Sequence, residues 1–146
     1  LKPFSYEFLN DFYNYIFKKA ISESMFTVTC GSALKWPLNK FFEIPAEGSL
    51  LICDPFYNMD KLGFKNGLNC IVLKDPTRIN DQVSKLLNNL DETQEITTRG
   101  KNMVMKNHSV VARISQIKMA TNSILKCPSK FNGAYWEEGE FLVYEK

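Results

Sequence analysis

The 146-residue sequence has little of what marks several large classes of protein. It has no run of about 18 apolar residues, so no membrane span is expected. A single histidine, and four cysteines without a Cys-x-x-Cys pair, give no sign of a metal site. The 18 basic residues nearly balance the 16 acidic ones, and a net charge of +2 argues against a nucleic-acid-binding protein. Charged residues interrupt the opening segment, which therefore does not resemble a signal peptide.

The four cysteines are expected to be buried free thiols. Cys30, Cys53 and Cys70 each fall at the end of a predicted strand, and Cys127 falls near the end of the last predicted helix. The glycosylation sequon Asn107-His108-Ser109 is a three-residue pattern that often arises by chance. We therefore expect a reducing, cytoplasmic location, with neither a cofactor nor a metal ion.

The 146-residue chain is long enough to bury a core. Strand-like and helix-like segments alternate along its first half. Strands are predicted at residues 26–30, in the apolar run of residues 49–54, and at residues 70–73. Short connections with intervening helices predict a parallel sheet with right-handed crossovers. The expected fold class is thus α/β, a Rossmann-like parallel sheet with flanking helices.

Helices are predicted where apolar residues recur at helical spacing. The first covers residues 4–24 with Ser5 as its N-cap, and its many aromatic side chains predict burial on more than one side. The second follows Pro37, expected in its first turn, and ends at Gly48. The remaining expectations are an Asp75-capped helix with the stripe Ile79, Val83, Leu86, Leu87 and Leu90, an Asp91-capped helix, and a helix from Ser109 to about Cys127, ended by Pro128.

Polar residues cluster where these strands end. The loop Gly31–Pro37 leaves a strand and opens a helix, and such a loop offers free backbone amides to an anion. Asp54 follows the next strand, and Glu43 lies on the helix between them. Because ligands of parallel sheets bind beyond the carboxyl ends of the strands, we expect these groups to converge on one crevice. The single His108 is expected to cap or pack rather than to catalyse.

The segments Lys40–Gly48 and Leu62–Val72 resemble the C-terminal domain of group 1 glycosyltransferases, and most nearly the spore-maturation-protein-like branch. The shared signature is (R/K)-x-F-E-x-P-A-x-G, and the resemblance extends from about Tyr6 to about Leu125. It implies the C-terminal half of a GT-B fold, here incomplete, since the partner Rossmann domain would precede these residues. Residues 1–127 would then form a partial donor-binding domain and residues 128–146 an aromatic-rich tail.

The resemblance implies a glycosyltransferase that binds a nucleotide-diphosphate sugar for transfer to an unidentified acceptor hydroxyl, supplied on the side of the missing N-terminal domain, with little activity in these residues alone. Glu43 and Lys40 would bind the donor nucleotide, with the Glu43 carboxylate on the ribose. Gly31, Ser32, Lys35 and Asp54 would lie at the diphosphate and sugar. Many relatives carry a second glutamate eight residues before the signature one, where this chain has Lys35. No catalytic residue is assigned.

Two other functions are compatible with parts of the pattern. A strand ending in Asp54 is also found in phospho-accepting receiver domains, but the acidic pair that such a domain needs does not follow Cys30. A non-catalytic nucleotide-sugar-binding or protein-interaction module of Rossmann-like fold is the stronger alternative. Turnover by a full-length parent chain would separate the enzyme from the module.

Overall fold

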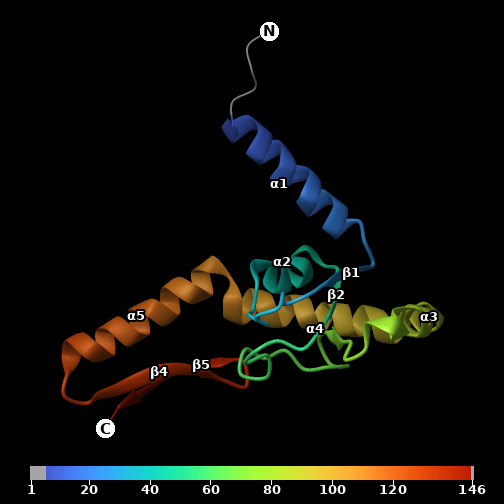
Figure 1. The fold of residues 1–146 in the computed structure, drawn as a ribbon. Coiled ribbons are helices and arrows are strands. Elements are labelled where there is room, and N and C mark those ends of the chain that lie inside the picture. Colours follow the sequence, from blue (N-terminus) through green and yellow to red (C-terminus); the bar gives the residue numbers. More distant parts are fainter. Residues whose placement is uncertain (1–5, 146) are drawn as a thin grey trace.

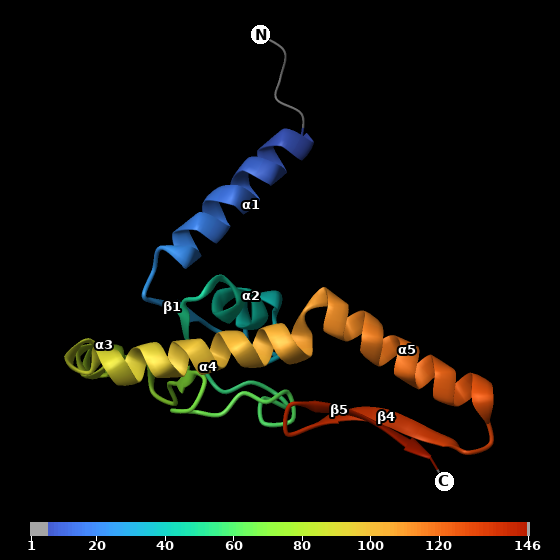
Figure 2. The ribbon, with the colours of Figure 1, turned by 180° about the vertical axis from the view of Figure 1, so that it is seen from behind.

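The computed structural model describes the backbone of residues 6–145 and the side chains of residues 10–144. Its elements are α1 (Tyr6–Ser22), β1 (Phe26–Thr29), α2 (Asn39–Glu47), β2 (Leu50–Cys53), β3 (Ile71–Val72), the 3-10 helix η1 (Pro76–Arg78), α3 (Ile79–Asn88), α4 (Leu90–His108), α5 (Val110–Lys126), β4 (Phe131–Glu137) and β5 (Glu140–Glu145). Helix α1 projects from the body (Figures 1 and 2). Helix α5 and the β4–β5 hairpin extend from the C-terminal end of α4, and α3 lies at its other end. No helix within the described range is long and apolar enough to cross a bilayer.

The three predicted strands form one parallel sheet in the order β1-β2-β3. This confirms the mixed α/β class and the Rossmann-like arrangement of a parallel sheet with flanking helices. The third strand is shorter than predicted, since it covers only Ile71–Val72. Asn66 Oδ1 accepts the Val72 N–H at 2.8 Å. Beyond it, the Leu73 N–H still donates to the Cys53 carbonyl at 2.7 Å.

Both faces of β2 are buried, as in other parallel sheets covered by helices. Because side chains alternate along a strand, Leu51 and Cys53 join one core cluster while Leu50 and Ile52 join the other. The first cluster takes in Phe41 and Ile44 of α2, together with Phe56, Phe64 and Val104. The second takes in Leu86 of α3 and Ile96 of α4. The sheet therefore has α2 on one face and α3 on the other, while α4 reaches both core clusters, through Val104 and Ile96.

Helix α2 ends as predicted but starts later. Gly48 is left-handed at φ 90°, and the N–H groups of Gly48 and Ser49 donate to the Pro45 and Ile44 carbonyls. The expectation that Pro37 lies in the first helical turn is wrong, since the helix begins at Asn39. The loop before the helix contains a turn in which the Lys35 N–H donates to the Ser32 carbonyl. The Lys35 carbonyl accepts the Tyr57 N–H at 2.8 Å, which joins this loop to the one after β2.

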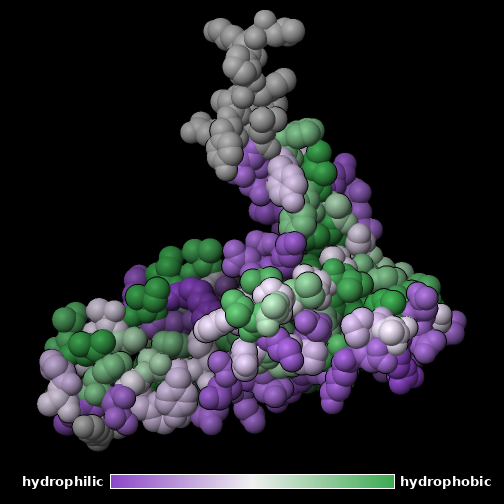
Figure 3. Space-filling view, in the orientation of Figure 1, coloured by the Kyte–Doolittle hydropathy of each residue, from purple (hydrophilic) through white to green (hydrophobic). Residues whose placement is uncertain are grey.

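The burial expected for α1 is wrong. Of its described side chains only Ile21 is buried and Phe17 half-buried, whereas Tyr13 and Tyr15 are about two-thirds exposed, at 65% and 64%. The cause is tertiary, because α1 points away from the sheet and only its last turns meet α2 (Figure 1). The predicted N-cap Ser5 lies outside the described residues. Figure 3 shows apolar surface over both α1 and α5.

The predicted helix caps have mixed outcomes. Asp75 caps η1, the 3-10 turn that leads into α3, since its Oδ1 accepts from the Thr77 N–H at 3.0 Å and from the Thr77 hydroxyl at 2.7 Å; the N-cap of α3 itself is Arg78, which makes no side-chain cap hydrogen bond. These hydrogen bonds lower the pKa of the exposed Asp75 carboxyl. The Asp91 cap is wrong, because α4 already begins at Leu90 and Asn89 occupies the N-cap position. The predicted apolar stripe is less buried than its pattern indicated, since Leu87 of α3 and Leu90, the first residue of α4, are about half exposed.

Helix α5 and the tail after it are better defined than the sequence indicated. Ser109 caps α5 through the Ala112 N–H, and the helix ends before Pro128 as predicted. The tail forms an antiparallel hairpin, β4–β5, which the sequence did not place. A hydrogen bond of 2.8 Å from the Gly139 N–H to the Lys61 carbonyl joins its turn to the loop before β3. The division into units at residue 127 stays a prediction.

His108 packs at the junction of α4, α5 and the hairpin, in the structural role expected for it. Its Nε2 lies 2.8 Å from the Leu62 carbonyl, which makes Nε2 the protonated nitrogen, and Nδ1 accepts from the Arg113 guanidinium at 2.9 Å. The ring stacks on Trp136 with centroids 4.7 Å apart, and Arg113 lies 4.5 Å over the same indole. A neutral imidazole therefore links the hairpin to the α/β body.

Replacing Gly100 with alanine should destabilise the fold. A Cβ at this position of α4 would lie 2.5 Å from the Asn69 carbonyl oxygen, a backbone atom that cannot move aside alone. In an open helix the change would gain about 1 kcal/mol. Here the clash costs roughly 1–3 kcal/mol, so we expect a net loss in the free energy of unfolding by urea. The control is Asn102→Ala, exposed on the same helix, which should change little; equal stability of Gly100→Ala and the parent would contradict the packing.

The stability of the fold should fall on mild acidification. Burial, and to a lesser extent the Arg113 charge, lower the pKa of His108, against the opposing effect of the Leu62 hydrogen bond. The unfolded state then binds the proton more tightly than the native state. The contribution is complete above the ordinary pKa of about 6.5 and is lost as the pH falls from there toward the lower folded value. Chemical denaturation across this pH range measures the free energy of unfolding. The control is His108→Gln, whose stability should depend less on pH in this range because the chain has no other histidine. An unchanged stability across the range would refute it.

Candidate functional site

A cavity of about 400 Å³ lies at the carboxyl ends of the parallel strands. It is lined by Val28, Thr29, Cys30, Cys53, Asp54, Leu73, Pro76 and Ile79. Each of the three strands contributes to it, either directly or through the residue that follows. This is the place where ligands bind in open parallel sheets.

The loops after β1 and β2 are tied together beside this cavity. Asp54 Oδ1 accepts the Gly31 N–H at 2.7 Å, a bond between a carboxylate and a backbone amide 23 residues apart. Ser32 and Lys35 follow in a tight turn, with the Lys35 N–H donating to the Ser32 carbonyl and both residues at positive φ. The structure thus brings together Gly31, Ser32, Lys35 and Asp54, and leaves the Ser32 and Lys35 side chains exposed.

Glu43 and Lys40 lie at a different depression, a cavity of about 280 Å³ between α1 and α2. It is lined by Tyr13, Asn14, Phe17, Lys18, Ile21, Asn39, Lys40, Glu43 and Glu47. The Lys40 ammonium is 5.9 Å from the centre of the Phe17 ring, and no ion pair joins it to Glu43 in the described part of the chain. This cavity shares no lining residue with the strand-end cavity, so the expected single crevice is divided in two.

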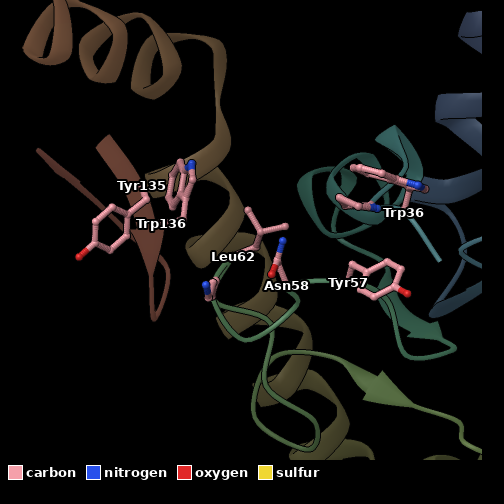
Figure 4. Close-up of a pocket in the computed structure, with 8 residues that line it drawn as sticks. Trp36, Tyr57, Asn58, Leu62, Tyr135 and Trp136 are labelled. Carbon is pink, nitrogen blue, oxygen red and sulfur yellow. The ribbon is translucent and has the colours of Figure 1, made fainter. Parts of the chain in front are cut away.

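A third depression, of about 590 Å³, was not foreseen from the sequence. It is lined by Trp36, Pro37, Tyr57, Asn58, Lys61, Leu62, Tyr135 and Trp136. In Figure 4, Trp36 and Tyr57 stand at one end and Trp136 at the other, with Asn58 and Leu62 between them. We call it the aromatic groove. Its only sequence signal was the aromatic tail, and nothing in the tail shows that it folds back onto the loops after β1 and β2.

The thiols divide into two groups. Cys53 and Cys70 are buried as predicted, and burial raises the pKa of the Cys53 thiol far above its ordinary value and that of Cys70 to about 12. Cys30 is exposed and Cys127 half-buried, so the expectation of burial is wrong for Cys30. Cys30 lies just beyond β1, where the chain turns out of the sheet. Among the side chains that the structure describes, those of residues 10–144, no cluster of three or more His, Cys, Asp or Glu could hold a metal ion.

The fold and the strand-end cavity define a Rossmann-like α/β domain. Over residues 7–119 the chain matches the family described as glycosyl transferase-like, and it belongs to that family. The match includes the parallel sheet and α4 but ends within α5, so β4 and β5 lie outside it. No curated protein and no solved structure matches the chain significantly.

The thiols should react with iodoacetamide in the order of their exposure. In the native protein Cys30 should be alkylated readily, while Cys53 and Cys70 should resist until denaturant is added, because buried thiols seldom ionise. Peptide mass mapping of alkylated samples measures each site. A Cys30→Ser variant should lose the fast reaction, and labelling of native Cys53 as fast as Cys30 would show that the sheet is not packed as described.

Proposed function

We propose that this domain binds the nucleotide-diphosphate sugar of a GT-B glycosyltransferase of group 1, in the spore-maturation-protein-like branch. The observation that carries the proposal is the family match over a parallel sheet whose strand-end loops are joined by the Gly31–Asp54 hydrogen bond. A glycosyltransferase-related domain needs a donor site, and the ends of parallel strands are where such folds hold nucleotides. A cytoplasmic location is part of the proposal.

The diphosphate is assigned to the turn after β1. The Lys35 ammonium is exposed there and can neutralise phosphate charge, and the exposed Ser32 hydroxyl can donate to a phosphate oxygen. The hydrogen bond from Gly31 to Asp54 holds the turn against the end of β2, so these donors need little ordering when a ligand binds. Half-buried Asp54 is assigned to the sugar hydroxyls at the edge of the same cavity.

Glu43 is assigned to the ribose hydroxyls and Lys40 to the donor nucleotide beside them. Both side chains are exposed, and both line the cavity between α1 and α2. Since that cavity shares no lining residue with the strand-end cavity, a donor that contacts both must bind in an extended conformation.

The reaction is transfer of a glycosyl group. An acceptor hydroxyl oxygen bonds to the anomeric carbon, the bond from that carbon to the diphosphate breaks, and the nucleoside diphosphate leaves with the electron pair. The hydroxyl proton passes to a base that we do not assign. Lys35 and Ser32 would favour the leaving group by stabilising its added negative charge.

One observation favours the non-catalytic alternative. The resemblance implies a glutamate in many relatives where this chain has Lys35, and a lysine cannot accept hydrogen bonds from a donor sugar. A domain that kept nucleotide-sugar binding without turnover would tolerate this change. Turnover by a full-length chain would exclude this alternative.

Glu43→Ala should weaken binding of nucleoside diphosphates to a protein carrying this domain. A hydrogen bond to a charged acceptor is worth about 1.5–3 kcal/mol, so the loss should be roughly ten- to a hundredfold. Glu43→Gln keeps one acceptor and should lose less. Calorimetric titration with UDP, GDP, ADP and CDP gives the affinities, and melting curves check the folding of each variant.

The matched control for this titration is Glu47→Ala. Glu47 lines the same cavity one turn further along α2, at a variable position of the family signature. It should bind the nucleotides as the parent does. If Glu43→Ala binds like the parent, or fails only because it unfolds, the ribose assignment is wrong. Absence of binding by every nucleotide to the parent would refute the donor site as a whole.

A further inference from the structure

The aromatic groove presents exposed rings on a fixed frame. It contains both tryptophans of the chain, and Trp36 and Tyr57 are 60% and 62% exposed. Trp136 at the other end is half-buried and packs against the hydrogen-bonded pair of His108 and Arg113, with the imidazole centroid 4.7 Å and the guanidinium carbon 4.5 Å from its ring. The Gly139–Lys61 and Tyr57–Lys35 backbone hydrogen bonds fix the hairpin and the loop that form its walls. The groove is therefore organised before any ligand arrives.

The chemistry of the lining is amphiphilic. Large flat rings stand at the two ends, while the side chains of Asn58 and Lys61 are exposed and have no hydrogen-bond or ion-pair partner among the described residues. The C–H groups on one face of a pyranose carry partial positive charge and pack on the electron-rich face of an aromatic ring. The ring hydroxyls at its edge need donors and acceptors such as an amide and an ammonium group. An entirely apolar ligand would leave these polar groups without partners.

We propose that the aromatic groove binds the saccharide chain of the glycosyl acceptor. This inference rests on the proposed donor function, because it identifies which molecule meets the donor sugar. Trp36 directly follows Lys35, and the Tyr57 N–H donates to the Lys35 carbonyl, so the groove adjoins the turn assigned to the diphosphate. A saccharide stacked on Trp36 and Tyr57 would have a hydroxyl near that turn.

The hairpin contributes one wall of the groove from outside the range matched by the family. Residues 131–145 lie outside the matched range, yet Tyr135 and Trp136 form one wall of the groove. The opposite wall comes from loops inside the matched range. An acceptor site built in this way combines the donor-binding domain with a segment outside the matched range.

The test is a titration of the 146-residue protein followed by tryptophan fluorescence. Because both tryptophans line the groove, the signal reports on this site directly. The probes are cellotriose, maltotriose, laminaritriose and triacetylchitotriose. At least one should give a saturable change in emission. No saturable change with any probe would overturn the proposal.

Variants separate stacking at the groove from general effects. Tyr57→Ala should weaken binding of the responding trisaccharide about three- to tenfold, while Tyr57→Phe should bind like the parent. Tyr15→Ala is the matched control, because Tyr15 on α1 has a similar exposure of 64% and lies outside the groove. Equal binding by Tyr57→Ala and the parent, or an equal loss in Tyr15→Ala, would overturn the assignment.

Nucleotide titration of the same samples distinguishes this inference from the donor proposal. Glu43→Ala should retain saccharide binding while losing nucleoside-diphosphate binding. If nucleotides bind and no saccharide does, the groove proposal fails and the donor proposal stands. If saccharides bind and no nucleotide does, the donor proposal fails and the groove is a saccharide site without the acceptor role. Displacement of the saccharide by UDP alone would mark the groove as part of the nucleotide site and overturn the proposal.

Discussion

Burial of β2 on both faces is the constraint on which the rest of the structure depends. All four of its residues are buried, and its neighbours β1 and β3 complete its backbone hydrogen bonds. Such a strand must enter and leave the core through polar residues. Ser49 at its start is buried but shares a hydrogen bond of 2.8 Å with the Thr27 hydroxyl, and Asp54 at its end accepts the Gly31 N–H. The position of the strand-end loops is therefore a consequence of core packing, and the loops need no separate device to bring them together.

The elements that local signals could specify were predicted well from the sequence. Gly48, Asp75 and Ser109 each make a helix-capping hydrogen bond to a residue within about one turn. The three strands follow from short apolar runs. Two local signals failed by a few residues, since α2 begins after Pro37 and α4 begins before Asp91. The larger failures involve tertiary structure. The burial of an aromatic helix such as α1 depends on where the helix points, which its own periodicity does not contain. The tail is placed by contacts between Trp136 and His108, residues far apart in the sequence, so no local pattern could reveal its docking.

The division of the predicted site has a simple geometric cause. Phe41 and Ile44 turn inward from α2 and are buried in the core. Lys40 and Glu43, three residues apart, share another face of the same helix, and that face meets α1. The periodicity that anchors α2 to the sheet therefore directs the signature glutamate away from the cavity beside Asp54. Topology alone predicted that the strand ends would converge, and they do, but it could not give the rotation of a helix about its axis.

The hairpin shows how a local junction can shape a distant surface. His108 holds Trp136 only as the neutral imidazole, since Nδ1 must accept from Arg113 while Nε2 donates to Leu62. This contact and the Gly139–Lys61 hydrogen bond set the hairpin against the loop after β2. The groove between them thus depends on residues that contact no proposed ligand. Under the two proposals, the matched domain carries the donor chemistry and the hairpin completes the acceptor surface. Specificity for the acceptor can then change through the hairpin while the buried sheet, and the loops it positions, stay as they are.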